Sequence, residues 1–205
     1  MDVYVLTKTY DTAFRQWVSG VTAVEPLPPS SNQLNTQLSP NLNLIKSISD
    51  EIVYHPVSYK LLFGSQANLS LQATFNVVQN SSSTASSSNI IARILTAINT
   101  FFNLDNWNFG DTFYFTELST YVLTQLNPDI TSFVIVPKQA GQYFGSLFEI
   151  QCPSNQIFIS CAQASDIVIV SGLTSANLKT ITGDALTTVI NTQNITSATN
   201  GASNG

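Results

Sequence analysis

The sequence predicts an α+β fold made of two small α/β units, in which short mixed or antiparallel sheets pack with a few amphipathic helices. Three observations predict it. In some segments the apolar residues recur every three or four positions, as on a helix face, and in others they alternate, as along a strand. These segments are short, and Pro, Gly, Ser and Asn separate them. A polar stretch at 79–89, almost entirely Ser, Thr, Ala and Asn, divides the chain.

That stretch is expected to be a flexible linker or loop between an N-terminal α/β unit at 1–78 and a C-terminal α+β unit at 90–172. From 173 to 205 the chain is poor in large apolar side chains and rich in Thr, Asn and Ala. We therefore expect a polar tail over 173–205, with a flexible end.

Within the N-terminal unit, residues 3–6 predict a short strand and residues 11–20 predict a helix. After a proline-rich loop, apolar residues three or four positions apart predict an amphipathic helix over 34–48. Residues 52–63 are rich in β-forming residues and contain a proline that marks an edge or a break. Strict alternation over 69–78 predicts a half-buried strand.

The C-terminal unit begins with the clearest helix of the chain, over 90–102, which Ser88 or Asn89 is expected to cap. A turn carrying Trp107 and Phe109 leads to a short extended segment, and a second helix then ends before Pro128. Further short strands are expected at 130–136, 147–151, 156–160 and 166–170.

The composition of the chain argues against several classes of protein. Charged residues make up 9% of the chain, the net charge is −5, and hydrophobic residues make up 43%. This hydrophobic content argues against a disordered acidic chain, and seven basic residues argue against a nucleic-acid-binding protein. No apolar run is long enough for membrane insertion, and the first ten residues lack a signal-peptide pattern, so we expect synthesis in the cytoplasm. A surface of neutral polar groups suits close packing in an assembly.

The two cysteines are not expected to form a disulfide. Residues 147–151 and 156–160 look like the strands of a hairpin, which would separate Cys152 and Cys161 by roughly 20 Å. A disulfide needs Cα atoms within about 7 Å. Two lone cysteines do not make a metal site either.

We assign no catalytic, cofactor-binding or metal-binding residue from the sequence. The only histidine, His55, has few partners for catalysis, and no nucleophile elbow is present. Asp105 and Asp111 flank the turn around Trp107 and either act as paired carboxylates, bind a cation, or stabilise the turn; we favour turn chemistry.

Aromatic residues are the remaining candidates for a functional site. Those that we assign to a protein interface are Trp107, Phe109, Tyr143 and Phe144. Aromatic side chains dominate interface hot spots, and packing in the core is the alternative for the same residues.

Several stretches of the C-terminal half resemble a known family. They are NWNFGDTFYFTEL at 106–118, PDITSFVIVP at 128–137, FGSLFEI at 144–150, QIFIS at 156–160 and DIVI at 166–169. They resemble the C-terminal part of the large baseplate wedge subunit of contractile-tailed bacteriophages, and the order of elements is similar to that of the wider baseplate J-like family. Members of that family are longer and carry a large N-terminal portion that this sequence lacks.

The resemblance implies a structural protein of the virion, located in the tail baseplate and assembled in the host cytoplasm. Its implied partners are copies of itself, as a dimer within a larger ring, and other baseplate wedge, hub or sheath-initiating subunits. Such a ring surrounds the central hub and rearranges when the tail contracts. One alternative is a receptor-binding or fibre-associated tail module. Another is a glycan hydrolase that uses Asp or Glu pairs, but we expect no enzymatic activity.

Overall fold

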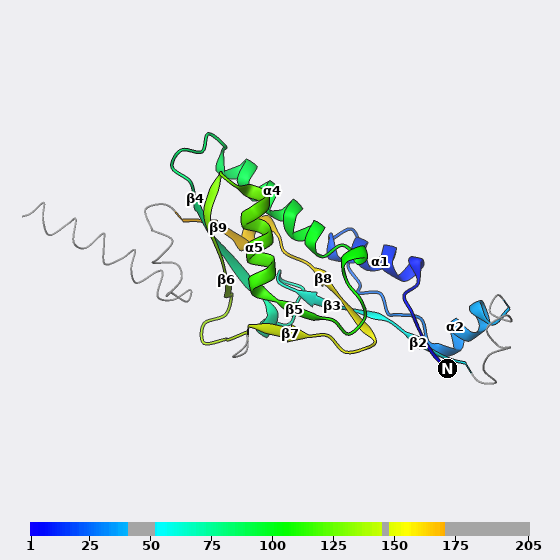
Figure 1. The fold of residues 1–205 in the computed structure, drawn as a ribbon. Helices are drawn as coiled ribbons and strands as arrows, with labels where there is room; N and C mark the ends of the chain where they lie inside the picture. Colours follow the sequence, from blue (N-terminus) through cyan, green and yellow to red (C-terminus); the bar gives the residue numbers. More distant parts are fainter. Residues whose placement is uncertain (41–51, 145–147, 171–205) are drawn as a thin grey trace, which may run out of the picture.

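The structure, a computed structural model, describes residues 1–40, 52–144 and 148–170. Over these residues the chain forms four α-helices and several small parallel, antiparallel and mixed sheets, which confirms the predicted α+β fold. Figure 1 shows an elongated arrangement, with the N-terminal elements at one end and the three-stranded sheet toward the other. The predicted polar tail at 173–205 lies outside the described residues.

One end of the molecule is a two-stranded parallel sheet. Here β1 (Asp2–Val5) pairs with β2 (Val53–Pro56), so the proline inside the predicted 52–63 segment is the last residue of a strand. Helix α2 (Ser31–Leu38) packs beside β2 and begins at Ser30 in a capping box. The helix predicted over 34–48 ends at Leu38, and its part from residue 41 onward lies outside the described residues.

A second parallel pair crosses the middle of the molecule (Figure 1). In it β3 (Ser58–Leu62) pairs with β8 (Gln156–Ser160), although the two strands are far apart in the sequence. Helix α1 (Lys8–Val18) covers one face of this pair. The small core between them consists of Tyr10, Phe14, Val57, Tyr59, Ile157 and Ile159. Phe158, on the alternate face of β8, belongs to the larger core of the C-terminal half.

The larger core surrounds a three-stranded sheet. Its central strand, β4 (Ala73–Gln79), pairs antiparallel with β6 (Ile130–Pro137) and parallel with β9 (Ile167–Ile169). The helices α4 (Ser87–Phe101) and α5 (Phe115–Leu126) pack on each other and add their apolar faces to this core. Because β4 has a neighbour on each side and helices above it, it is almost fully buried rather than half-buried.

Shorter elements complete the C-terminal half. The strands β5 (Thr112–Tyr114) and β7 (Glu149–Gln151) form an antiparallel pair. Three single-turn 3₁₀-helices lie at Leu69–Leu71, Leu104–Asn106 and Ala164–Asp166.

The division into units at 1–78 and 90–172 requires correction. Strand β3 pairs with β8, and β4 lies between β6 and β9, so strands from both sides of the predicted boundary share sheets. Phe63 and Phe75, from before the boundary, belong to the same core as α4 and α5. The two predicted units therefore have a common core over the described residues.

The predicted flexible linker at 79–89 is a loop held in place by hydrogen bonds and an ion pair, and we call it the fastened loop. The backbone N–H of Asn80 donates to the carbonyl oxygen of Asp129, over 2.8 Å, and the side-chain amide of Asn80 donates to the carbonyl oxygen of Pro128, over 2.9 Å. The Ser83 hydroxyl donates to the Asp129 carboxylate over 2.6 Å, and Arg93, near the middle of α4, forms an ion pair with the same carboxylate. Ser86 caps α4, whereas Ser88 or Asn89 was expected to do so.

The predicted hairpin of 147–151 and 156–160 is wrong, because β7 pairs with β5 and β8 pairs with β3. Hydrogen bonds join the end of β7 and the start of β8 to the turn before β5. The Cys152 N–H donates to the Asp111 carbonyl over 2.9 Å, and the Gly110 N–H donates to the Gln156 carbonyl over 3.2 Å. Both cysteines, between which we expected no disulfide, are free and buried in the structure.

Candidate functional site

Trp107 is a structural anchor at the end of α4. Its indole N–H donates to the Phe101 carbonyl oxygen over 2.8 Å, and its ring stacks on Phe102 with centroids 5.6 Å apart. Its other ring contacts include Phe158 of β8 at 5.2 Å. Trp107 thus joins α4 to the central pair of strands, and only part of its surface remains available to another molecule.

Phe144 is a core residue, which corrects its assignment to an interface. Its side chain is 6% exposed and stacks on Phe115 with ring centroids 4.4 Å apart. The neighbouring Tyr143 is 78% exposed, and Phe109 is 38% exposed. Of the four predicted interface residues, these two have the accessible aromatic surface that an interface residue needs.

Two exposed aromatic residues of the structure, Tyr114 and Phe148, were not among the four that we assigned to an interface from the sequence. Both lie at the β5–β7 pair, where Tyr114 is paired with Glu149 and the Phe148 carbonyl accepts a hydrogen bond from the Phe115 N–H. Strand alternation was the available signal for Tyr114, because Phe113 and Phe115 on either side of it are buried. We use the name β5–β7 aromatic surface for four exposed aromatic residues that lie in β5 or near β5 and β7 in the sequence, namely Phe109, Tyr114, Tyr143 and Phe148.

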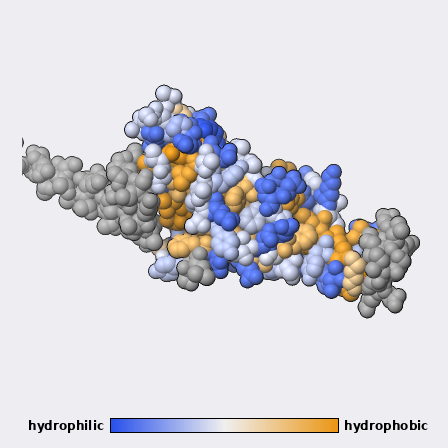
Figure 2. Space-filling view, viewed as in Figure 1, coloured by the Kyte–Doolittle hydropathy of each residue, from blue (hydrophilic) through white to orange (hydrophobic). Residues whose placement is uncertain are grey.

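Apolar side chains do not form one continuous area on the face drawn in Figure 2. They lie there in separate patches among neutral and hydrophilic residues. Exposed apolar side chains also occur on the loop between α1 and α2, namely Val21, Val24 and Leu27. The face drawn in Figure 2 therefore presents several small apolar contact areas rather than one broad hydrophobic surface.

The two aspartates around Trp107 have different environments. One oxygen of Asp111 accepts a hydrogen bond from the Asn108 N–H over 2.7 Å, which is the turn chemistry expected for this residue. Asp105 lies in the first turn of a 3₁₀-helix and is exposed. Across the described ranges, no three His, Cys, Asp or Glu side chains come close enough together to hold a metal ion.

The histidine and the cysteines occupy structural positions. His55 Nε2 lies 2.8 Å from an oxygen of Asp2, and the His55 ring stacks on Tyr4, so these contacts join β1 and β2. Hydrogen bonding to His55 lowers the pKa of the Asp2 carboxyl. Burial raises the pKa of the Cys152 and Cys161 thiols to about 11, so neither is an ionised nucleophile at neutral pH.

A search for membrane-spanning helices and comparisons with known proteins add no functional assignment. None of the helices in the described part of the chain is long and apolar enough to cross a membrane. Neither a protein-family model nor a curated protein matches the sequence.

Proposed function

We propose that this protein is a structural subunit of a phage contractile-tail baseplate, of the wedge type, which acts through protein–protein contacts. In this role it associates with copies of itself, as a dimer within a larger ring, and with other wedge, hub or sheath-initiating subunits. It is assembled in the host cytoplasm and resides in the tail baseplate of the virion, where the ring rearranges on contraction.

The observation that carries this proposal is the β5–β7 aromatic surface. Its four members lie in or beside the stretches 106–118 and 144–150, which also carry the resemblance to baseplate wedge subunits. Exposed aromatic side chains contribute large contact areas at a small cost in conformational entropy, which is why they dominate interface hot spots. A low content of charged residues also favours close packing of one subunit against another.

The association state of the full chain tests the proposal. Light scattering on a sizing column, over a wide range of concentrations, should detect a dimer or a ring-like species. Replacing Tyr143 and Phe148 together by Ser should weaken this association at least about thirtyfold, because one hot-spot residue contributes about 2 kcal/mol or more. Leu27→Ser is the matched control, since Leu27 is 86% exposed but lies outside the aromatic surface.

The outcomes separate the alternatives. Equal loss of association in the double variant and in Leu27→Ser would contradict a specific role for the aromatic surface. A chain that stays monomeric at all concentrations, alone and with wedge subunits, would contradict the proposal and favour the receptor-binding module.

A further inference from the structure

We propose that the pocket between the end of α4 and the start of α5 receives a cationic side chain, best an arginine, from a neighbouring protein subunit. The inference rests on the proposed function only in assuming that the chain acts through protein contacts. The pocket has a volume of about 420 Å³. Its lining residues are Phe101, Asn106, Trp107, Asp111, Thr112, Glu117 and Tyr121.

The walls of the pocket are aromatic and held in place. Phe101 contacts Trp107 edge-to-face at 5.6 Å and Tyr121 at 5.5 Å between ring centroids. The Trp107 ring is held in place by its stacking on Phe102 and by the hydrogen bond that its indole N–H donates to the Phe101 carbonyl oxygen. Such rigid aromatic rings attract a cation placed over their faces, and they do so best for a guanidinium, which also stacks as a flat group.

The free carboxylate oxygens of the pocket favour a donor as the ligand, whereas the hydroxyl groups of Thr112 and Tyr121 can either donate or accept. The indole N–H of Trp107 and the side-chain amide N–H of Asn106 already donate to backbone carbonyls at the end of α4. One oxygen of Asp111 and the carboxylate of Glu117 accept no hydrogen bond from any described residue. The guanidinium carries only donors, whereas a sugar offers as many acceptors as donors. A cationic ligand therefore matches the free acceptors better than a sugar does.

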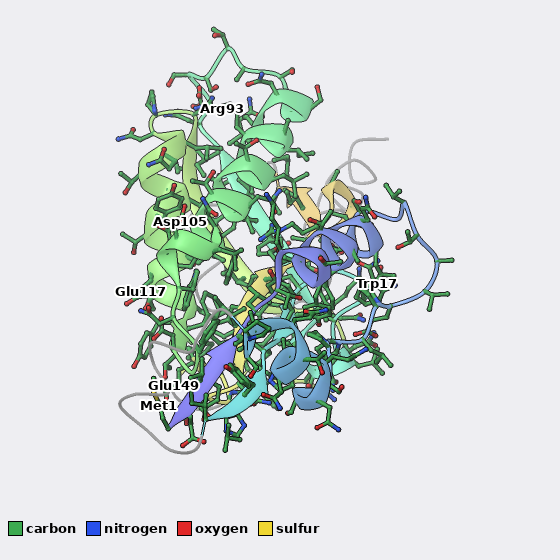
Figure 3. All side chains as sticks on the ribbon, turned by 90° about the vertical axis from the view of Figure 1, so that its right-hand side faces the viewer. Met1, Trp17, Arg93, Asp105, Glu117 and Glu149 are labelled. Atoms are coloured by element: carbon green, nitrogen blue, oxygen red, sulfur yellow. The ribbon has the colours of Figure 1, made fainter. Side chains whose placement is uncertain are left out.

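The charges around the pocket also favour a cationic ligand. Arg15, Arg93 and Lys138 form ion pairs with aspartates elsewhere in the fold. Among the described residues, no cation pairs with Asp105, Asp111, Glu117 or Glu149. Asp105, Glu117 and Glu149 follow one another down the same side of the molecule in Figure 3. The negative end of the α4 dipole lies at the pocket, and so does the positive end of the α5 dipole, whose first turn contains Glu117. The carboxylates of Asp111 and Glu117 therefore have no ion-pair partner among the described residues, and a partner's arginine would supply one.

Titration of the isotope-labelled full chain with Nα-acetyl-arginine amide tests the proposal by NMR. We expect shifts of the Trp107 indole N–H and of the Thr112 amide, with a dissociation constant on the order of millimolar for so small a probe. The citrulline analogue has nearly the same shape without the charge, and it should bind at least about fivefold more weakly. Glu117→Gln should weaken binding of the arginine probe by about three- to tenfold.

Glu25→Gln is the matched control, because it removes the same charge from a residue outside the pocket. It should leave probe binding unchanged. Equal weakening by the two substitutions, equal binding of citrulline, or binding of maltose without binding of arginine would each overturn the proposal. So would the absence of any shift at tens of millimolar arginine probe. Since the probe is a free amino-acid derivative, this result does not depend on whether the chain assembles, so a failed assembly experiment and an empty pocket are distinguishable.

Discussion

Gly64 lies where no side chain fits, and Gly64→Ala is the sharpest test of the packing. The residue has φ +53°, in the left-handed region, directly after β3. A Cβ atom there would lie 1.9 Å from the carbonyl oxygen of Cys161, which is backbone and cannot rotate away. Either the end of β8 or the end of β3 must therefore move.

The cost follows from what such a movement disturbs. Holding an alanine in the left-handed region costs about 1–2 kcal/mol. The Cys161 N–H donates to the Leu62 carbonyl over 3.0 Å, and the Cys161 thiol donates to the Phe63 carbonyl over 2.9 Å. Leaving a buried group of this kind without its partner costs about 1–3 kcal/mol more. We therefore expect Gly64→Ala to lower the free energy of unfolding by about 2–5 kcal/mol.

Urea unfolding followed by circular dichroism measures this loss, and Gly20→Ala is its control. Gly20 has φ +78° but no atom within 4 Å of the added Cβ, so that variant should lose only the backbone contribution of about 1–2 kcal/mol. If the two variants lose the same free energy of unfolding, within about 0.5 kcal/mol, the contact between the residue-64 position and Cys161 is not as described.

Two further predictions concern the core and the fastened loop. Phe144→Ala should lower the free energy of unfolding by about 3–5 kcal/mol, because the Phe144 ring is buried against Phe115. Tyr143→Ala should change it by no more than about 0.5 kcal/mol, because the Tyr143 ring is exposed. Similar losses for the two variants in urea unfolding would contradict the assignment of Phe144 to the core and Tyr143 to the surface. Hydrogen bonds from Ser83 and Arg93 lower the pKa of the Asp129 carboxyl, so its stabilising contribution is present at neutral pH and is lost as the pH falls through and below the ordinary aspartate range. Asp129→Asn should therefore lower the urea midpoint at pH 7 and shrink its drop between pH 7 and pH 3; an unchanged drop would refute the linkage.

The elements of this fold were predictable because they are encoded locally. The apolar stripe over 90–102 predicted α4, and the alternating or apolar runs predicted β4, β6, β7, β8 and β9 to within a few residues. Strand pairing was not predictable in the same way. Sequence neighbours often pair, which favoured a hairpin between β7 and β8, but β7 pairs with β5 and β8 pairs with the distant strand β3.

The candidate site was predictable in type but not residue by residue. An aromatic-rich sequence predicts aromatic contacts, yet adjacent residues have opposite environments: Tyr143 faces solvent and Phe144 is buried. The pocket also escaped sequence reasoning, because α4, the turn with Trp107 and α5 each contribute only part of its lining. In the sequence the pocket was indicated only by the carboxylates Asp111 and Glu117. They can be recognised as part of a binding site only once the structure places them beside the aromatic walls.

The strands of the stretches 106–118 and 128–137 pack against residues that precede them in the chain. Phe133 of β6 stacks on Phe75 of β4 with ring centroids 5.5 Å apart, and Phe113 of β5 packs against Phe63, which follows β3. Because the strands on which Phe133 and Phe113 lie are thus packed against the segment 58–79, the β5–β7 aromatic surface and the pocket have a rigid support that the C-terminal half alone does not provide. If the protein has the proposed role in a contracting baseplate, this shared core would keep its two halves together under load, whereas a flexible linker at 79–89 would let them move apart.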